Sequence, residues 1–127
     1  MFMILPSTVV LTMDNSGARR VRCLKIYKKP GLSYAFIGDI LLVIVVRLRN
    51  RGLMRVTKGD IYTCLVTRIT ERIFRKKRGY FFKFDTNTVI MLNKKGLPIG
   101  TRIFGPVSKE LLNKGFNRII SLCSKIL

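Results

Sequence analysis

Short apolar stretches separated by turn-forming residues follow one another along most of this chain. Residues 7–13 are rich in β-forming residues and lead into a turn-forming cluster, Asp14-Asn15-Ser16-Gly17. Residues 61–69 form another such stretch. Residues 79–84 and 88–92 lie on either side of Asp85-Thr86-Asn87, which predicts a hairpin at this turn. The pattern therefore predicts a chain built mainly from strands.

The segment from residue 20 to residue 26 changes phase once. Residues 20–23 alternate polar and apolar side chains, and residues 24–26 alternate in the opposite phase. Because neighbouring side chains of a strand point to opposite faces, a change of phase at Cys23 and Leu24 predicts a β-bulge.

Residues 40–46 are all apolar, which predicts a strand buried on both faces, as in a closed barrel or beneath a covering element. The stretch is far shorter than the about 20 residues of a membrane-spanning helix. The pairs Gly38-Asp39 and Gly59-Asp60 each precede a predicted strand. In each pair the glycine allows a positive φ and the aspartate can bind local backbone. We interpret the pairs as two similar turns rather than as an internal repeat.

Helical signals are confined to the C-terminal part of the chain. Pro106 precedes residues 107–114, Glu110 and Lys114 lie in the first half and last turn, and Gly115 follows, which predicts a helix over residues 107–114. Several short strands and one late helix predict a mainly β fold with a small closed barrel of roughly five strands. At 127 residues, we expect a single domain spanning residues 1–127.

Charge narrows the class of protein. The chain has 25 Lys and Arg, 6 Asp and Glu and no His, for a formal charge of +19. Its 48% of hydrophobic residues allows a core, which sets it apart from disordered basic tails. Such a basic body predicts a partner of dense negative charge, with nucleic acid first and a membrane surface second. Residues 1–18 lack the basic residues of a secretory or mitochondrial targeting segment, so we expect none.

The basic residues gather in three clusters at residues 19–29, 47–58 and 68–83, separated by uncharged strands. One such cluster is usually a solvated loop, but three clusters without compensating acids indicate phosphate binding. The third cluster carries four consecutive basic residues at the tip of a predicted β-ribbon, a shape that suits the grooves of folded RNA. The predicted RNA-binding residues are Arg19, Arg20, Arg22, Lys28, Lys29, Arg47, Arg49, Arg51, Arg75, Lys76, Lys77 and Arg78.

Catalytic and metal-binding patterns are missing from the sequence. The carboxylates are scattered and suit turns, caps or arginine partners, and no nucleophile has an evident base, so we expect no enzyme and no cofactor. Cys23, Cys64 and Cys123 lack metal-ligand spacing, and we expect Cys23 and Cys64 to be small buried hydrophobes. The aromatic residues in the stretch 80–84 could stack on bases or pack in the core, and both readings stay open.

Several motifs resemble those of the universal large-subunit ribosomal protein fourteen family, in matching order across essentially the whole chain. The resemblance is carried by Asp14-Asn15-Ser16-Gly17-Ala18-Arg19-Arg20, Tyr34-Ala35, Gly38-Asp39-Ile40, Lys58-Gly59-Asp60, Phe84-Asp85 with Asn87, Gly100-Thr101-Arg102-Ile103-Phe104-Gly105-Pro106-Val107, Glu110-Leu111 and Ile119-Ile120-Ser121-Leu122.

The resemblance implies a five-stranded barrel with a protruding β-ribbon and a small C-terminal helical region. It also implies binding to large-subunit rRNA at the intersubunit face and a bridge to small-subunit rRNA. Expected partners are neighbouring large-subunit proteins, with the nineteen-family protein first, and a ribosome-silencing factor in bacteria and organelles. No membrane partner is implied.

The chain departs from the family pattern by losing acids and gaining bases. Arg78 stands where family members often have an acid, and residues 47–52 lack the usual acid and proline. The family ending Ala-Pro-Glu-Val-Leu is replaced by Cys123-Ser124-Lys125-Ile126-Leu127, which puts docking of a silencing factor in doubt. This drift favours a mitochondrial ribosome as the location, with the bacterial cytoplasm as the alternative.

Two other classes of protein remain open from the sequence. A free-standing RNA-binding barrel, acting as an RNA chaperone or translation factor, would be soluble alone and would not sediment with large subunits. A peripheral membrane protein would need a basic amphipathic helix, and residues 107–114 are too short and too weakly cationic to supply one.

Overall fold

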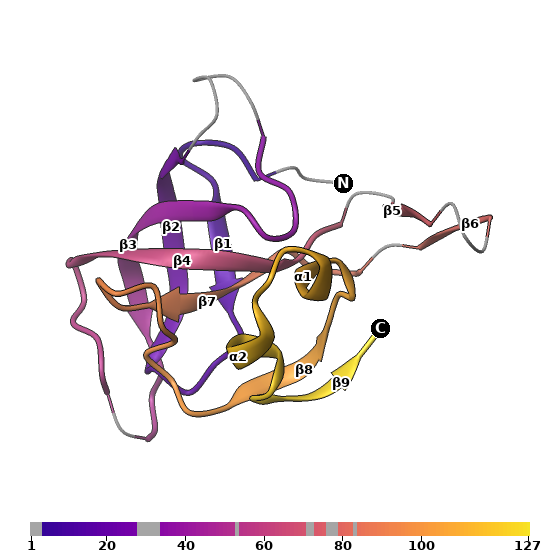
Figure 1. Cartoon of the computed structure of the whole chain (residues 1–127). Coiled ribbons are helices and arrows are strands. Elements are labelled where there is room, and N and C mark those ends of the chain that lie inside the picture. Colours follow the sequence, from indigo (N-terminus) through magenta and orange to yellow (C-terminus); the bar gives the residue numbers. More distant parts are fainter. Residues whose placement is uncertain (1–3, 28–33, 53, 71–72, 76–78, 83) are drawn as a thin grey trace.

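A computed structural model describes residues 4–27, 34–52, 54–70, 73–75, 79–82 and 84–127. Five strands close into a barrel in the order β1-β2-β3-β4-β7 (Figure 1), which confirms the predicted mainly β fold. The barrel strands are β1 (Val9–Thr12), β2 (Ala18–Ile26), β3 (Ile40–Leu48), β4 (Ile61–Arg68) and β7 (Thr88–Leu92). All neighbours pair antiparallel except β1 and β7, whose parallel pairing closes the barrel.

The predicted bulge is present in β2. Cys23 pairs with Val43 and Lys25 pairs with Leu42, so Leu24 is an extra residue in the ladder between β2 and β3. Val21, Cys23 and Ile26 are all buried despite the change of phase. The bulge therefore lets both halves of β2 direct apolar side chains into the barrel.

Strand β3 has one buried face, and the prediction of burial on both faces was wrong. Leu41, Val43 and Val45 are at most 2% exposed, whereas the alternate residues from Ile40 to Val46 are half-buried. Only one face of a barrel strand lines the interior, and the outer face of β3 is partly covered rather than enclosed.

The predicted hairpin between residues 79–84 and 88–92 was also wrong. Strand β6 (Tyr80–Phe82) pairs instead with β5 (Ile73–Arg75), and β7 pairs with β4 and β1. The β5–β6 ribbon projects from the barrel (Figure 1), as predicted, and its tip at residues 76–78 lies outside the described residues. Two hydrogen bonds join the chain segments that enter and leave the ribbon: Phe84 N donates to Ile69 O (3.2 Å), and Thr70 N donates to Asn87 Oδ1 (2.9 Å).

The C-terminal segment contains less helix than predicted. The helix predicted over residues 107–114 is shortened to α1 (Glu110–Asn113), although Gly115 has the expected positive φ of 86°. Of the residues predicted as helical, Val107 instead ends β8 (Ile103–Val107), and Ser108 and Lys109 separate β8 from α1. Strand β8 pairs in parallel with β9 (Cys123–Ile126), so Pro106 lies in a strand. A second short helix, α2 (Asn117–Ile120), lies between α1 and β9 in the sequence. The helical region is therefore present but minor.

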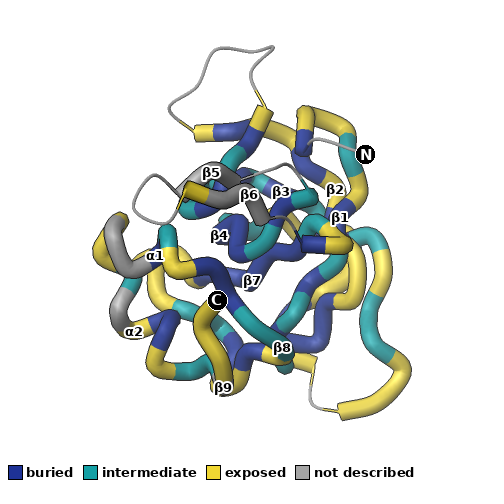
Figure 2. Tube along the Cα trace, turned by 90° about the vertical axis from the view of Figure 1, so that its right-hand side faces the viewer, coloured by how far each residue is buried: buried dark blue, intermediate teal, exposed yellow. Residues whose placement is uncertain are grey.

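Buried residues gather in the barrel strands, and exposed residues lie mainly in the connecting loops (Figure 2). Cys23 and Cys64 are fully buried, as predicted. Burial raises the pKa of both thiols, and the proximity of Cys23 and Asp14 raises the pKa of Cys64 further. Within the described part of the chain, no helix has the length and apolarity to cross a membrane.

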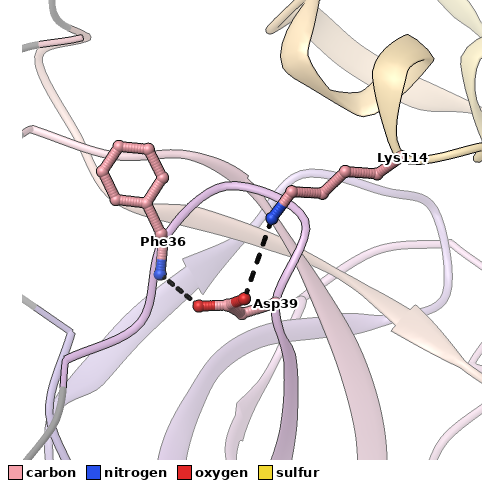
Figure 3. Close-up of polar contacts among 3 residues, drawn as sticks. All are labelled: Phe36, Asp39 and Lys114. Carbon is pink, nitrogen blue, oxygen red and sulfur yellow. Dashed lines mark hydrogen bonds and ion pairs between the residues drawn. The ribbon is translucent and has the colours of Figure 1, made fainter. Parts of the chain in front are cut away.

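The turn before β3 contacts the C-terminal segment (Figure 3). Asp39 Oδ2 accepts a hydrogen bond from Phe36 N (2.6 Å), and Oδ1 lies 3.9 Å from Lys114 Nζ. Gly38 has φ 89°, and a Cβ there would lie 2.3 Å from Lys114 Cδ. The predicted roles of Gly38 and Asp39 in this turn are confirmed, and Lys114 joins the turn to the end of α1.

Candidate nucleic-acid interface

Two sequence blocks far apart in the chain interlock at one end of the barrel. Asn15 Oδ1 accepts hydrogen bonds from Thr101 N (2.7 Å) and Arg102 N (3.1 Å), and its Nδ2 donates to Thr101 Oγ1 (2.9 Å). Gly100 lies so close that a Cβ there would be 2.6 Å from Asn15 Oδ1. The turn at residues 14–17 therefore holds residues 100–102 mainly through the Asn15 amide, and Asn15 N adds a backbone hydrogen bond to Arg102 O (3.3 Å).

Asp14 fixes the same turn from inside. Its carboxylate is 1% exposed and accepts hydrogen bonds from Ser16 Oγ (2.7 Å), Ser16 N (3.4 Å) and Met91 N (2.9 Å). Burial raises the pKa of Asp14 above its ordinary value, and the hydrogen bonds and the Arg49 guanidinium offset part of the rise. The hydrogen bond from Met91 N anchors the turn to β7.

The loop that follows β3 is bonded to this turn by its backbone. Arg49 N donates to Gly17 O (2.8 Å), and Arg55 N donates to Ser16 O (2.7 Å). The Arg49 side chain is half-buried, and its Nη2 donates to Thr12 O (3.1 Å). These bonds bring the second basic cluster against the turn and β8.

A cleft of about 380 Å³ lies between the turn, this loop and β8. The Arg49 guanidinium carbon lies 5.5 Å from the centre of the Phe104 ring, and Phe104 is 37% exposed. The residues lining the cleft are Asn15, Gly17, Arg49, Arg51, Gly52, Arg55 and Phe104. We call it the arginine cleft.

Several predicted RNA-binding residues come together on the outer face of β2 and β3. Arg20 and Arg47 are register partners on these two strands, and Arg22 lies two residues further along β2. All three side chains are exposed, as are Arg19 and Arg51. Like charges directly opposite each other destabilise a sheet, so this pair favours a bound anion.

Among the other predicted residues, Arg49 lies beside the turn and Arg75 lies in the ribbon. Arg75 ends β5, in register with Tyr80. The remaining predicted residues lie outside the described residues: Lys28, Lys29, Lys76, Lys77 and Arg78.

Sequence reasoning missed Arg55, Arg68 and Phe104. Arg55 belongs to the basic cluster at residues 47–58, and its membership of that cluster was the signal that could have identified it. Arg68 is half-buried with Nε donating to Thr88 Oγ1 (3.0 Å), and burial lowers its pKa. Phe84 is 8% exposed and packs in the core, so stacking on bases is wrong for this residue.

The sequence profile of the family described as ribosomal protein L14p/L23e matches residues 3–127, all of the chain except its first two residues. The match spans the barrel, the ribbon and the C-terminal segment together. It confirms the resemblance noted in the sequence motifs. This family consists of structural ribosomal proteins and is not an enzyme family. The chain therefore belongs to the L14p/L23e family of ribosomal proteins and is a structural constituent of the ribosome.

Proposed function

We propose that this protein binds large-subunit rRNA at the intersubunit face and contributes to a bridge with small-subunit rRNA. The observation that carries the proposal is the pairing of Arg20 with Arg47 on the outer face of the barrel. Arg20 and Arg47 are exposed register partners, so their like charges repel each other in the free protein, and a phosphate bound by both side chains removes that repulsion.

The binding mechanism follows from a rigid barrel with cationic loops. Each Lys or Arg that replaces a condensed counterion adds roughly 0.7–0.9 to the slope of log affinity against log salt concentration. Most contacts go to phosphate and sugar, and RNA shape supplies the specificity. The basic loops thereby screen the repulsion between rRNA segments that approach each other closely.

Neighbouring large-subunit proteins, the nineteen-family protein or its equivalent first, are the proposed protein partners. A ribosome-silencing factor is a further proposed partner. The replacement of the acidic family ending by residues 123–127 argues against its docking at that ending. We propose mitochondrial ribosomes as the location because the chain has lost acids and gained bases relative to the family pattern, with the bacterial cytoplasm as the alternative. Fractionation of the source cells tests this location, and recovery outside purified mitochondria would refute it.

The test of the RNA-binding face is the double charge reversal Arg20→Glu with Arg47→Glu. We expect the tagged variant to enter large subunits several-fold less than wild type, because two phosphate contacts become repulsive. The control is Lys109→Glu with Lys125→Glu, which changes the net charge equally at exposed positions of the C-terminal segment. An equal loss of incorporation into large subunits in both variants would mean that net charge decides incorporation and that the β2–β3 face has no specific role.

A further inference from the structure

The arginine cleft combines an exposed aromatic ring with three arginines that line one hollow. Its volume of about 380 Å³ falls within the roughly 300–1,000 Å³ of small-molecule sites. Arg49, Arg51 and Arg55 come from one loop, and Phe104 comes from β8. The two sides are held together by the hydrogen bonds of the turn at residues 14–17.

We propose that the arginine cleft binds one unpaired nucleotide of RNA, with its base against Phe104 and its phosphate against Arg51 and Arg55. This inference rests on the proposed function, since it names the part of an rRNA that the cleft would take. It also separates this site from the β2–β3 face, where arginines meet phosphates without an aromatic partner.

The position of Phe104 supports a stacking role. The register between β8 and β9 shifts between Ile103 and Pro106, so Phe104 falls in the irregular part of the pair. Its backbone is nevertheless fixed, because Phe104 N donates to Met13 O (2.7 Å). The Arg49 guanidinium lies over the ring, which leaves the exposed part of the ring for a base.

The charges in the cleft support a phosphate. Within the described residues, no carboxylate forms an ion pair with Arg51 or Arg55. Both side chains are exposed, and an anionic ligand with several oxygens supplies the acceptors that these two guanidinium groups lack.

The chemistry of the cleft predicts little preference among bases. The Asn15 amide oxygen is already bonded to Thr101 N and Arg102 N, and one amide N–H is bonded to Thr101 Oγ1, so only a single N–H is left to meet a base edge. Stacking tolerates every base, because each has a π-face. The ligand class is therefore an unpaired nucleotide in a bulge or loop, rather than a particular sequence.

The chain contains no tryptophan, so Phe104→Trp introduces a single fluorescent reporter into the cleft. The probes are three RNA hairpins at one salt concentration: one with a single bulged nucleotide, one with an abasic bulge and one fully paired. We expect the bulged hairpin to quench the tryptophan and the other two to leave it unchanged. The control is Ile61→Trp, a 57% exposed position outside the cleft, which no hairpin should quench selectively.

Affinity supplies the second readout. Phe104→Leu should weaken binding of the bulged hairpin roughly 5- to 150-fold and leave the paired hairpin unchanged. Equal quenching by the abasic hairpin would mean phosphate binding only and would overturn the inference. Binding of all three hairpins with no quenching would refute nucleotide binding in the cleft and would leave the proposed function standing. Failure to bind any hairpin would overturn both.

Discussion

Asn15 shows how one side chain can organise a site. Its amide satisfies two backbone donors and one hydroxyl of residues 101–102, and Gly100 leaves the space that the amide needs. The two blocks that it joins lie more than eighty residues apart in sequence. These bonds join the segment before β8 to the turn that also binds residues 49–55, which we call the arginine loop.

Replacing Asn15 tests that role. We expect Asn15→Ala to lower the free energy of unfolding by about 1–2 kcal/mol, because it removes three hydrogen bonds to partly exposed groups, each with a net value of about 0.5–1.5 kcal/mol. The measurement is urea-induced unfolding, with Asn50→Ala as the control. Asn50 is exposed in the arginine loop and should change stability by less than about 0.5 kcal/mol. Equal effects of the two substitutions would refute the anchoring role.

Asp14 gives a pH-dependent prediction. Because burial raises its folded-state pKa above the ordinary value of 3.8, the folded protein holds this proton more tightly than the unfolded chain. The stability that Asp14 contributes is therefore full below pH 3.8 and falls as the pH rises through the interval up to the folded-state value. Asp14→Asn does not titrate and serves as the reference.

The measurement is the difference in unfolding free energy between wild type and Asp14→Asn at several pH values. We expect the advantage of wild type to shrink as the pH rises through that interval. An advantage that grows with pH would mean that the charged carboxylate is the form preferred in the folded state.

At the scale of elements, the bulge in β2 has a specific consequence. Leu24 has no partner of its own between the pairs Cys23–Val43 and Lys25–Leu42, so its deletion leaves a one-to-one ladder. Val21, Cys23 and Ile26 would still face the barrel interior in the shortened strand. Deletion of Arg22, which pairs with Ile44, would instead turn buried residues outward.

We therefore expect the Leu24 deletion to be the milder of the two deletions. Each large apolar side chain turned outward forfeits about 1.5–3 kcal/mol of burial energy, which should lower the melting temperature of the Arg22 deletion further. Thermal unfolding followed by circular dichroism compares the two variants. A Leu24 deletion that melts at the lower temperature would show that the bend made by the bulge matters more than the ladder.

The elements also show what the sequence could predict. The barrel strands and the bulge follow from local alternation, which residues 20–26 display directly. The partner of a strand is not local information: Asp85 to Asn87 signalled a turn but could not say that β7 pairs with β4 and β1. Likewise Pro106 and Gly115 marked a helix, while the distant residues of β9 drew residues 103–107 into a strand.

The site was predicted in the same uneven way. Basic clusters are visible in the sequence, so Arg20, Arg47 and Arg49 could be named in advance. Their arrangement could not, because the register of β2 and β3 and the approach of Phe104 to Arg49 depend on tertiary contacts. Phe104 stood out in the sequence only as part of the family motif at residues 100–107, with no sign of a binding role.

At the scale of the whole molecule, a charge of +19 surrounds a barrel with an apolar interior. A body this basic repels itself, and a polyanion relieves the repulsion. The family match identifies the ribosome as the assembly that supplies one. The central proposal is therefore that the protein resides in the large ribosomal subunit and is held there by its basic surface.

Sedimentation of a cell extract through a sucrose gradient, with the protein quantified in each fraction, tests that claim most directly. We expect recovery mainly with large subunits and intact ribosomes, and a shift to light fractions when high salt or ribonuclease removes the RNA contacts. Recovery mainly in light fractions of the untreated extract would contradict the account and favour a free-standing RNA-binding barrel.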